Sequence, residues 1–423
     1  MLKRIALQLY RAAILVAIAW VIHAHHVRLR IEGDAPITIE EIKPLYPQAA
    51  VLSPDSSERR GFHVTDSAGH DLGYVIRTMP GVADIVGYRG WTDTLVAFDP
   101  ALHIIGVRIR SSQDTREHVG DIRDDRYFLK TWNGKSWDAV ARTTPEQEGI
   151  EGVSGASMTS MAMADGITRR LASANAALAV KPQPMRIRAR DWGLIAIIAT
   201  GLVFALAGSY RRQWLRRGFQ LLVIVYIGFF TGDLLAQSLI AGWMQSGIPW
   251  RIAPALTLLF AAALAVPWTT GKPLYCQQLC PHGAAQELLH RITPKRWRLA
   301  IPRGLDAGLR WLPPALLAVV IVISLLALPI DPAHLEPFDA YLIRTAGAAT
   351  IGIAVAGLAA SLFVPMAYCH YGCPTGALLN FIRARGRQDR FGRRDIAALL
   401  LLLLAAFLSW KYQQIHQWMV KIE

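Results

Sequence analysis

The chain has 423 residues, 53% of them apolar, and its mean hydropathy of +0.28 exceeds that of an ordinary soluble enzyme. We therefore expect a membrane protein, not a soluble, collagen-like or disordered chain. The net charge is +14, but residues 26–180 carry 21 acidic and 17 basic side chains, so the basicity belongs to the two ends of the chain. That placement indicates contact with membrane lipid and argues against nucleic acid as a partner.

The first apolar segment, Ile5–Ile22, follows two basic residues and has no small-residue cleavage site after it, which is typical of an uncleaved signal anchor. Residues 27–187 hold no apolar run long enough to cross a bilayer. They alternate short β-like stretches with turns, and we expect a helix from Ser157 to Ala174. The predicted fold is thus a transmembrane anchor over residues 1–26 and an α+β domain over residues 27–187.

Residues 188–423 are predicted to form a polytopic membrane domain, because six more runs approach the roughly 20 apolar residues that a bilayer requires. Lys and Arg concentrate in alternate loops, which places the N-terminus in the cytoplasm and the α+β domain outside. We therefore expect about seven transmembrane helices in a bacterial inner membrane. The six runs are Trp192–Ser209, Phe219–Trp243, Ile252–Trp268, Trp311–Ile330, Thr345–Met366 and Ile396–Trp410.

All four cysteines belong to a duplicated motif, Tyr-Cys-x3-Cys-Pro-x-Gly-Ala, at residues 275–284 and 368–377. Cysteines four residues apart lie on one helical face, and the proline after the second favours a helix start or a kink. Two facing pairs could bind zinc or an iron–sulfur centre, or act as redox-active dithiols. A packing role as small buried side chains is the alternative. The proposed ligands are Cys276, Cys280, Cys369 and Cys373.

Three polar side chains near these motifs or inside a span are further candidates. His282 and His370 adjoin the cysteines and could tune the thiolate pKa or serve as ligands. Asp233 falls inside the run Phe219–Trp243, where an ionisable group is costly. It could belong to a quinone site or a proton path, or could simply pair with a neighbour.

A turn of small residues at 151–156 leads into the helix expected from Ser157. Its glycines allow a phosphate or a large planar group to approach the backbone, and the N-terminus of a helix favours an anion. From these residues alone, a simple N-cap is the commoner explanation of such a turn.

The same segment resembles the flavinylation motif of RnfG/NqrC-type FMN-binding domains, Asp-Gly-x-Ser/Thr-Gly-Ala-Thr, whose last residue carries FMN through a phosphoester. The resemblance implies covalent FMN at Ser157, with Thr159 as the second candidate, and attachment by a flavin transferase. Gly87-Tyr-Arg-Gly90, His103-Ile-Ile-Gly-Val107 and Gln113-Asp-Thr115 loosely resemble further stretches of these domains. The other motif positions are Glu151, Ser154, Gly155 and Ala156.

An FMN-binding domain followed by two Cys-x3-Cys-Pro motifs resembles the NosR/NirI family, and the layout is similar to its short PceC/CprC-type members. The resemblance implies a membrane-bound electron-transfer flavoprotein that passes electrons between a quinol or cytoplasmic-side donor and an extracytoplasmic FMN. Its recipient would be an exported reductase or a maturation factor for one.

Longer members of the family carry a ferredoxin domain, whereas residues 1–423 contain no fifth cysteine. We therefore expect a quinol or a separate ferredoxin-type subunit to deliver electrons. The alternative function is a redox-sensing regulatory or maturation protein without catalytic turnover. A thiol–disulfide relay is disfavoured, because the basic loops place the cysteines on the reducing side of the membrane.

Overall fold

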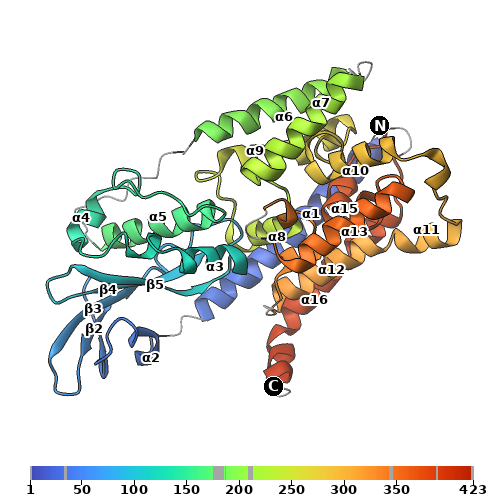
Figure 1. The fold of residues 1–423 in the computed structure, drawn as a ribbon. Helices are drawn as coiled ribbons and strands as arrows, with labels where there is room; N and C mark the ends of the chain where they lie inside the picture. The colour runs from blue at the N-terminus through green and yellow to red at the C-terminus, as the bar shows by residue number, and fades with distance from the viewer. Residues whose placement is uncertain are drawn as a thin grey trace. The chain divides into compact units, whose positions relative to one another are not determined.

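The computed structural model describes residues 2–32, 36–174, 185, 187–207, 213–326, 328, 330–342, 346–386 and 389–420 (Figure 1). The chain divides into two compact units, which we treat separately. The sheet unit comprises residues 26–185 and 245–252, and the helical unit comprises residues 1–25, 186–244 and 253–423. Ser209 and Thr345, which end one expected span and begin another, lie outside the described residues.

Five antiparallel strands follow one another in chain order in the sheet unit. Side chains along a strand alternate between faces, and both faces of the central strands are buried. Tyr74 and Phe98 contribute to the core on one face, whereas Val75 and Ala97 contribute to the core on the other. The elements are α2 (Ile39–Ile42), β1 (Val51–Pro54), β2 (Phe62–Thr65), β3 (Asp71–Arg77), β4 (Thr92–Phe98), β5 (Ile104–Ser112), α3 (Arg116–Asp124), η1 (Phe128–Lys130), α4 (Trp137–Arg142) and α5 (Ser157–Ser173).

Helix α5 begins at Ser157, as the sequence predicts, and is fixed along its length. Met163, Ile167 and Leu171 are four residues apart and form one apolar stripe that packs into the core. Farther along, the guanidinium of Arg170 donates from Nε to the carbonyl oxygen of Arg77, at 3.0 Å, on strand β3. The middle and last turns of α5 therefore have a defined position against the sheet.

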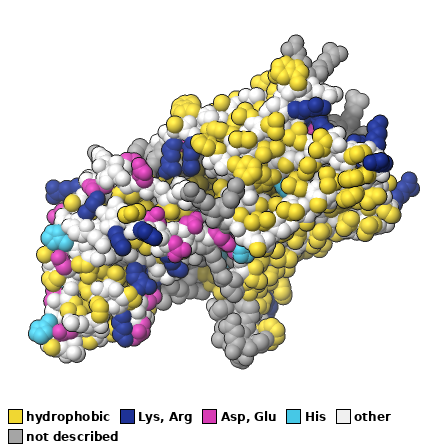
Figure 2. Space-filling view, viewed as in Figure 1, with side chains coloured by type: hydrophobic (Ala, Val, Ile, Leu, Met, Phe, Trp, Pro, Cys, Tyr) yellow, Lys and Arg dark blue, Asp and Glu magenta, His cyan; other side chains and the backbone are white. Residues whose placement is uncertain are grey.

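Most of the helical unit consists of apolar helices. Figure 2 shows that apolar side chains cover the visible face of these helices, whereas charged side chains are frequent on the sheet unit. The unit contains α1 (Leu2–Glu32, which begins in it), α6 (Ala189–Ala207), α7 (Gln213–Val223), η2 (Ile224–Thr231), α8 (Gln237–Ser246), α9 (Pro254–Thr270), η3 (Tyr275–Leu279), α10 (Pro281–Ile292), η4 (Lys295–Trp297), α11 (Arg303–Leu309), α12 (Leu312–Leu325), η5 (Pro332–Leu335), η6 (Asp339–Tyr341), α13 (Ala348–Phe363), α14 (Ala367–Tyr371), α15 (Pro374–Ile382) and α16 (Arg393–Val420).

Within the described residues, four helical stretches are long and apolar enough to cross a membrane, and two shorter apolar helices accompany them. These findings support a membrane protein. The long stretches are Ile5–Leu29, Ala189–Leu206, Arg303–Leu325 and Arg393–Ile415, and the shorter helices are Pro254–Thr270 and Ala348–Phe363.

The expected span Phe219–Trp243 is not one continuous helix. A π-helical segment follows α7 and ends at Gly232, whose φ of +68° breaks the helix before α8 begins. Asp233 lies in this break and is buried. The total of about seven transmembrane helices is therefore not confirmed, because a left-handed glycine interrupts the helix within this apolar run.

The acidic segment between α12 and α13 folds into the helical unit. Glu336 is buried, and its carboxylate accepts hydrogen bonds from the backbone nitrogens of Gln237 and Ser238 at 2.9 and 3.0 Å. The hydroxyl of Tyr341 lies 3.2 Å from Nδ1 of His282, in the first turn of α10. This irregular backbone is thus packed against other parts of the helical unit.

Candidate functional site

The small-residue turn before α5 is held together by its own hydrogen bonds. The backbone nitrogen of Val153 donates to Oγ of Ser160 at 2.9 Å. Gly155 has a φ of +89°, in the left-handed region that glycine adopts without strain. A Cβ at Gly152 would lie 3.1 Å from Cα of Ser157, so the turn packs closely against the start of the helix.

The two hydroxyl groups proposed for flavin attachment lie in different environments. Ser157 is half-buried, and its Oγ donates to the carbonyl oxygen of Val153 at 3.1 Å. Thr159 is 1% exposed, and its Oγ1 donates to Oδ2 of Asp114 at 2.7 Å. The hydroxyl of Ser157 is thus partly accessible, whereas the hydroxyl of Thr159 is enclosed by protein. Of the other motif residues, Glu151, Ser154 and Gly155 are exposed and Ala156 is buried.

Asp114 connects α5 to two loops of the sheet unit. Its buried carboxylate accepts hydrogen bonds from the backbone nitrogens of Tyr88, Arg89 and Thr115, at 2.9, 3.1 and 2.8 Å, in addition to the bond from Thr159. A carboxylate that accepts this many bonds is well compensated for its burial. Asp114 therefore positions the first turn of α5, a role that sequence reasoning missed.

The Gly-Tyr-x-Gly stretch is explained by close packing around the same carboxylate. A Cβ at Gly87 would lie 2.4 Å from Oδ2 of Asp114, and one at Gly90 would lie 2.7 Å from the carbonyl oxygen of Gln113. Neither position has room for a side chain. The two glycines thus allow the loop to pack against Asp114. In the sequence, this packing was indicated by the three-residue spacing of the glycines.

The start of α5 fits the phosphate end of FMN. The first N–H groups of a helix have no intrahelical acceptor, and the helix dipole is positive at this end. A phosphate bound to the hydroxyl of Ser157 would be close to these N–H groups. The glycine at 152, which has no side chain to block the approach, is consistent with the same use.

The two cysteine motifs have the same local architecture in the helical unit. Cys280 and Cys373 are the N-cap residues of α10 and α15, and proline occupies the first position of both helices. Each sulfur accepts a hydrogen bond from a glycine backbone nitrogen, Gly283 at 3.4 Å and Gly376 at 3.1 Å. The prediction of a helix start at the proline is confirmed.

The glycine of each motif is also required by packing. A Cβ at Gly283 would lie 2.9 Å from the carbonyl oxygen of Cys276, and one at Gly376 would lie 3.3 Å from the sulfur of Cys373. The Cys-Pro-x-Gly spacing therefore describes a helix cap in which the thiol and the glycine nearly touch. Cys276 and Cys280 do not share a regular α-helix, because the segment between them is π-helical.

Gln286, on α10 of the first motif, binds the second motif. Its Nε2 donates to the sulfur of Cys369 at 3.2 Å, and its Oε1 accepts from the backbone nitrogen of Tyr368 at 3.1 Å. Oε1 also accepts from Oγ of Ser361 at 2.9 Å. This buried side chain holds the two motifs together, and sequence reasoning gave no indication of it.

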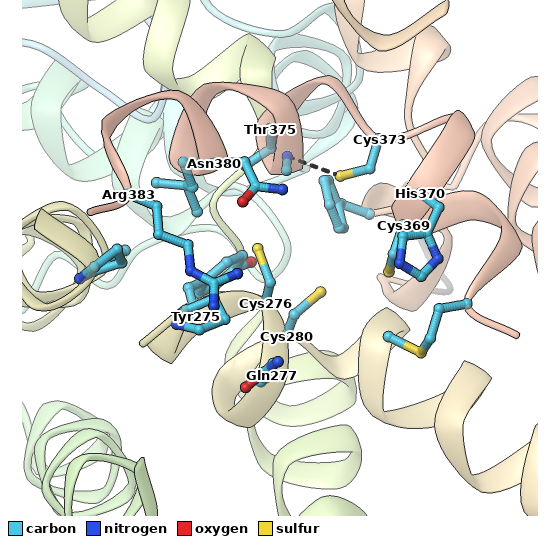
Figure 3. A pocket seen from close by; sticks show the side chains of 17 residues that line it. Tyr275, Cys276, Gln277, Cys280, Cys369, His370, Cys373, Thr375, Asn380 and Arg383 are labelled. Atoms are coloured by element: carbon cyan, nitrogen blue, oxygen red, sulfur yellow. Dashed lines mark hydrogen bonds between the residues drawn. The ribbon is translucent and has the colours of Figure 1, made fainter. Parts of the chain in front are cut away.

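All four cysteines line one cavity of about 240 Å³, together with Tyr275, His370 and Arg383 (Figure 3). They are free thiols in the structure. Among the described residues, no group of three or more metal-ligating side chains is arranged around a single ion. Thiols spaced around a shared cavity fit an iron–sulfur cluster, which takes four cysteine ligands.

The two histidines next to the cysteines differ. His282 is fully buried with Nδ1 beside Tyr341, and does not line the cavity. His370 lines it, and its Nδ1 lies 3.2 Å from the carbonyl oxygen of Pro365.

A second cavity, of about 640 Å³, is lined by basic side chains and reaches two of the cysteines, Cys369 and Cys373. Two carboxylates, Asp306 and Asp389, also line it. The excess of positive charge would offset the negative charge of a thiolate-bound centre. The basic lining residues are Arg310, Arg383, Arg385, Arg390, Arg393 and Arg394, with His370 beside them.

Two family models match these regions. A model described as an FMN-binding domain matches residues 87–172, which include the Gly-Tyr-x-Gly stretch and most of α5. A model described as a 4Fe-4S binding domain matches residues 252–300 and 346–394, which contain the two cysteine motifs. An FMN-binding domain and a 4Fe-4S binding domain therefore occur in one chain.

Several curated proteins are similar over parts of the chain. The regulatory protein NosR of Pseudomonas aeruginosa is 30% identical over 232 residues, which is 48% of this chain and 31% of NosR. The putative electron transport protein YccM of Escherichia coli is 32% identical over 160 residues, 35% of this chain and 43% of YccM. Protein NirI of Paracoccus denitrificans is 28% identical over 205 residues, 43% of this chain and 30% of NirI.

The chain thus covers less than half the length of each of these relatives. No solved structure matches it. The two family models, in the order expected from the motifs, and the similarity to both NosR and NirI confirm the resemblance drawn from the sequence. The protein is a NosR/NirI-like membrane protein that carries an FMN-binding domain and a 4Fe-4S binding domain.

Proposed function

We propose that the protein passes electrons between a quinol or a cytoplasmic-side donor and an FMN on the outer side of a bacterial inner membrane. The observation that carries this proposal is the convergence of four cysteines from two matching motifs on one cavity, in a chain that also has an FMN-binding domain. An exported reductase, or a maturation factor for one, would receive the electrons.

The sheet unit would hold the flavin covalently at Ser157. Support comes from the half-exposed hydroxyl at the start of α5 and from the bond to Asp114 that occupies Thr159. FMN supplies both one-electron and two-electron chemistry, and the protein contributes its position and its electrostatic surroundings. A flavin transferase would have to form the phosphoester bond.

The helical unit would hold an iron–sulfur centre through the four cysteines. A bound cluster supplies one-electron chemistry, and its potential depends on hydrogen bonds to sulfur, on net charge and on solvent exposure. Gln286, Gly283 and Gly376 each donate a hydrogen bond to a cysteine sulfur. The surrounding arginines would raise the potential, because positive charge favours the reduced form.

A reconstituted system tests electron transfer directly. The full chain, loaded with both cofactors and reconstituted in liposomes, would be mixed with a quinol or a reduced ferredoxin, and flavin absorption followed by stopped flow. We expect flavin reduction by one of these donors, and repeated turnover when an acceptor reoxidises the flavin. A flavin that neither donor reduces in the loaded protein would contradict the proposal.

Topology is tested separately, since the proposal places donor and flavin on opposite sides. Reporter fusions after Pro182 and after Glu423 should both report an extracytoplasmic location, because basic residues concentrate in the alternate loops. A cytoplasmic signal after Pro182 would refute the outward-facing flavin.

A regulatory function is the second candidate, because NosR of Pseudomonas aeruginosa is named a regulatory protein. In that case reduction of the flavin or the thiol centre would change the affinity for a partner without sustained turnover. The liposome experiment distinguishes the two, since a regulator would take up only stoichiometric electrons.

A further inference from the structure

A separate cavity lies in the helical unit among α1, α8, α12, α15 and α16. Its volume is about 120 Å³. An engineered apolar cavity of about 150 Å³ binds benzene, so this cavity is close to the size of a single six-membered ring. The lining is almost entirely apolar, and includes Ile18, Met244, Ile321 and Phe381.

One polar side chain in this lining has no partner. Gln237, the first residue of α8, is 3% exposed and lines the cavity. Its backbone nitrogen donates to Glu336, but neither Oε1 nor Nε2 of its side chain has a hydrogen-bond partner among the described residues. Buried amides are rarely left unpaired, because burial removes the water that would otherwise bind them. The pair of free amide atoms therefore points to a ligand.

The chemistry of the amide indicates which ligand this is. A glutamine side chain both donates and accepts, so Nε2 can bind the carbonyl oxygen of a quinone and Oε1 can bind the hydroxyl of a quinol. The site could therefore hold both redox states without a change in its own protonation. A saturated acyl chain would leave both atoms unpaired.

The position of the cavity suits a lipid-soluble redox molecule. Thr375, two residues after Cys373, lies in the wall of both this cavity and the cysteine-lined one. Leu15 and Leu317 in the lining are only half-buried, and they belong to two of the helical stretches long enough to cross a membrane. An isoprenoid tail could thus leave the cavity toward the lipid, while the ring stays near the cysteines.

We propose that this cavity binds the ring of a lipid-soluble quinone or quinol, with the side-chain amide of Gln237 as its hydrogen-bond partner. The inference rests on the proposed electron-transfer function, and it names the donor class and its site. It concerns binding alone, and so is testable independently of turnover.

Photolabelling tests the site in the complete protein. The full chain in lipid nanodiscs would be illuminated with an azido-quinone, and the labelled peptides identified by mass spectrometry with and without competing ubiquinone and menaquinone. We expect label on α8, α12 or α16, and at least a tenfold loss of quinone affinity in Gln237→Leu, which preserves the side-chain volume. Gln237→Asn should recover part of that loss.

Gln220→Leu is the matched control, because it removes a buried amide of the same unit that binds Glu287 and does not line the cavity. It should bind quinone normally. If Gln237→Leu fails to accumulate, Ala398→Phe, which fills the cavity from α16, should abolish the label instead.

Equal labelling of wild type, Gln237→Leu and Ala398→Phe would overturn the site. So would competition by an isoprenoid alcohol as effective as that by quinone, since the cavity would then be an acyl-chain site. Either outcome leaves the electron-transfer proposal standing if reduced ferredoxin still reduces the flavin. Failure of every donor to reduce the flavin, with labelling intact, would reject the proposed function and keep the quinone site.

Discussion

The hydroxyl of Thr159 donates a 2.7 Å hydrogen bond to the buried carboxylate of Asp114, two residues from a hydroxyl that is half-exposed. This hydrogen bond therefore distinguishes Thr159 from Ser157, the other hydroxyl that is a candidate for flavin attachment. Thr159 is hydrogen-bonded to Asp114. Ser157 lies at the start of the helix, and among the described residues its hydroxyl bonds to the carbonyl oxygen of Val153 alone.

The first prediction is that Ser157→Ala abolishes covalent flavin. Co-expression with a flavin transferase should give the wild type a fluorescent band in a denaturing gel, and this variant none. Thr159→Ala should keep a band, although a weaker one, because it removes a buried hydrogen bond that contributes about 1 kcal/mol to stability. Ser173→Ala, at the exposed C-terminal end of α5 and outside the motif, serves as the control. A band that survives in Ser157→Ala and is lost in Thr159→Ala would move the attachment by two residues.

The second prediction concerns the carboxylate itself. Asp114→Asn should destabilise the sheet unit by roughly 2–4 kcal/mol, because an amide has one acceptor oxygen where the carboxylate uses two for four donors. Limited proteolysis of the full chain in detergent should show earlier cleavage within residues 87–172, and flavin loading should fall in parallel. Asp124→Asn, on the same unit, should change neither. Unaltered proteolysis and loading in Asp114→Asn would show that the bonds around it do not position α5.

The third prediction is that the cysteines act as one unit. A single Cys→Ser change at any of Cys276, Cys280, Cys369 or Cys373 should lower flavin reduction by the physiological donor nearly as much as removal of all four, since groups that share a function are non-additive. Iron content after anaerobic purification should fall in step. Membrane levels should stay near normal.

Gln286→Leu offers a milder test of the same centre. It removes the hydrogen bond to Cys369 and leaves all four thiols in place. We expect iron to be retained and the reduction potential of the centre to fall, because a hydrogen bond to sulfur stabilises the reduced form. The third prediction would be contradicted by small, additive losses of flavin reduction across the single cysteine variants, together with an absence of iron from the wild type. The cysteines would then be packing residues.

The sequence predicted features that depend on neighbouring residues. The start of α5 at Ser157 and the helix starts at Pro281 and Pro374 follow from local rules, since proline fits the first turn of a helix and small polar residues precede it. The duplicated cysteine spacing was visible for the same reason.

Features that depend on distant residues were not predictable. The glycine at 232 ends a helix inside an apolar run, and hydropathy does not distinguish a broken span from a continuous one. Gln286 and Asp114 gain their roles from partners 83 and 45 residues away along the chain, Cys369 and Thr159. A polar residue whose partner lies so far away looks like any other in a single sequence.

A buried ion pair joins the first and last helices of the helical unit. Arg11, on α1, has no exposed surface, and its Nε lies 2.7 Å from Oδ1 of Asp395 on α16. Its Nη1 also contacts Asp389 at 2.9 Å, and Asp389 in turn accepts from Arg394. The two helices are far apart in the sequence, so this network joins the N-terminal and C-terminal parts of the helical unit.

The fourth prediction follows from the cost of breaking such a pair. Arg11→Met should destabilise the helical unit by about 3–5 kcal/mol, because it leaves two buried carboxylates with one arginine fewer, and a buried charge without its partner is strongly unfavourable. Asp395→Asn should be similarly costly, and the double variant should lose less than the sum of both, since the remaining partner is no longer charged. The temperature of aggregation in detergent ranks the stability of these variants. Arg390→Met, at an exposed position, is the control. Strictly additive losses would show that Arg11 and Asp395 stabilise the fold independently of each other.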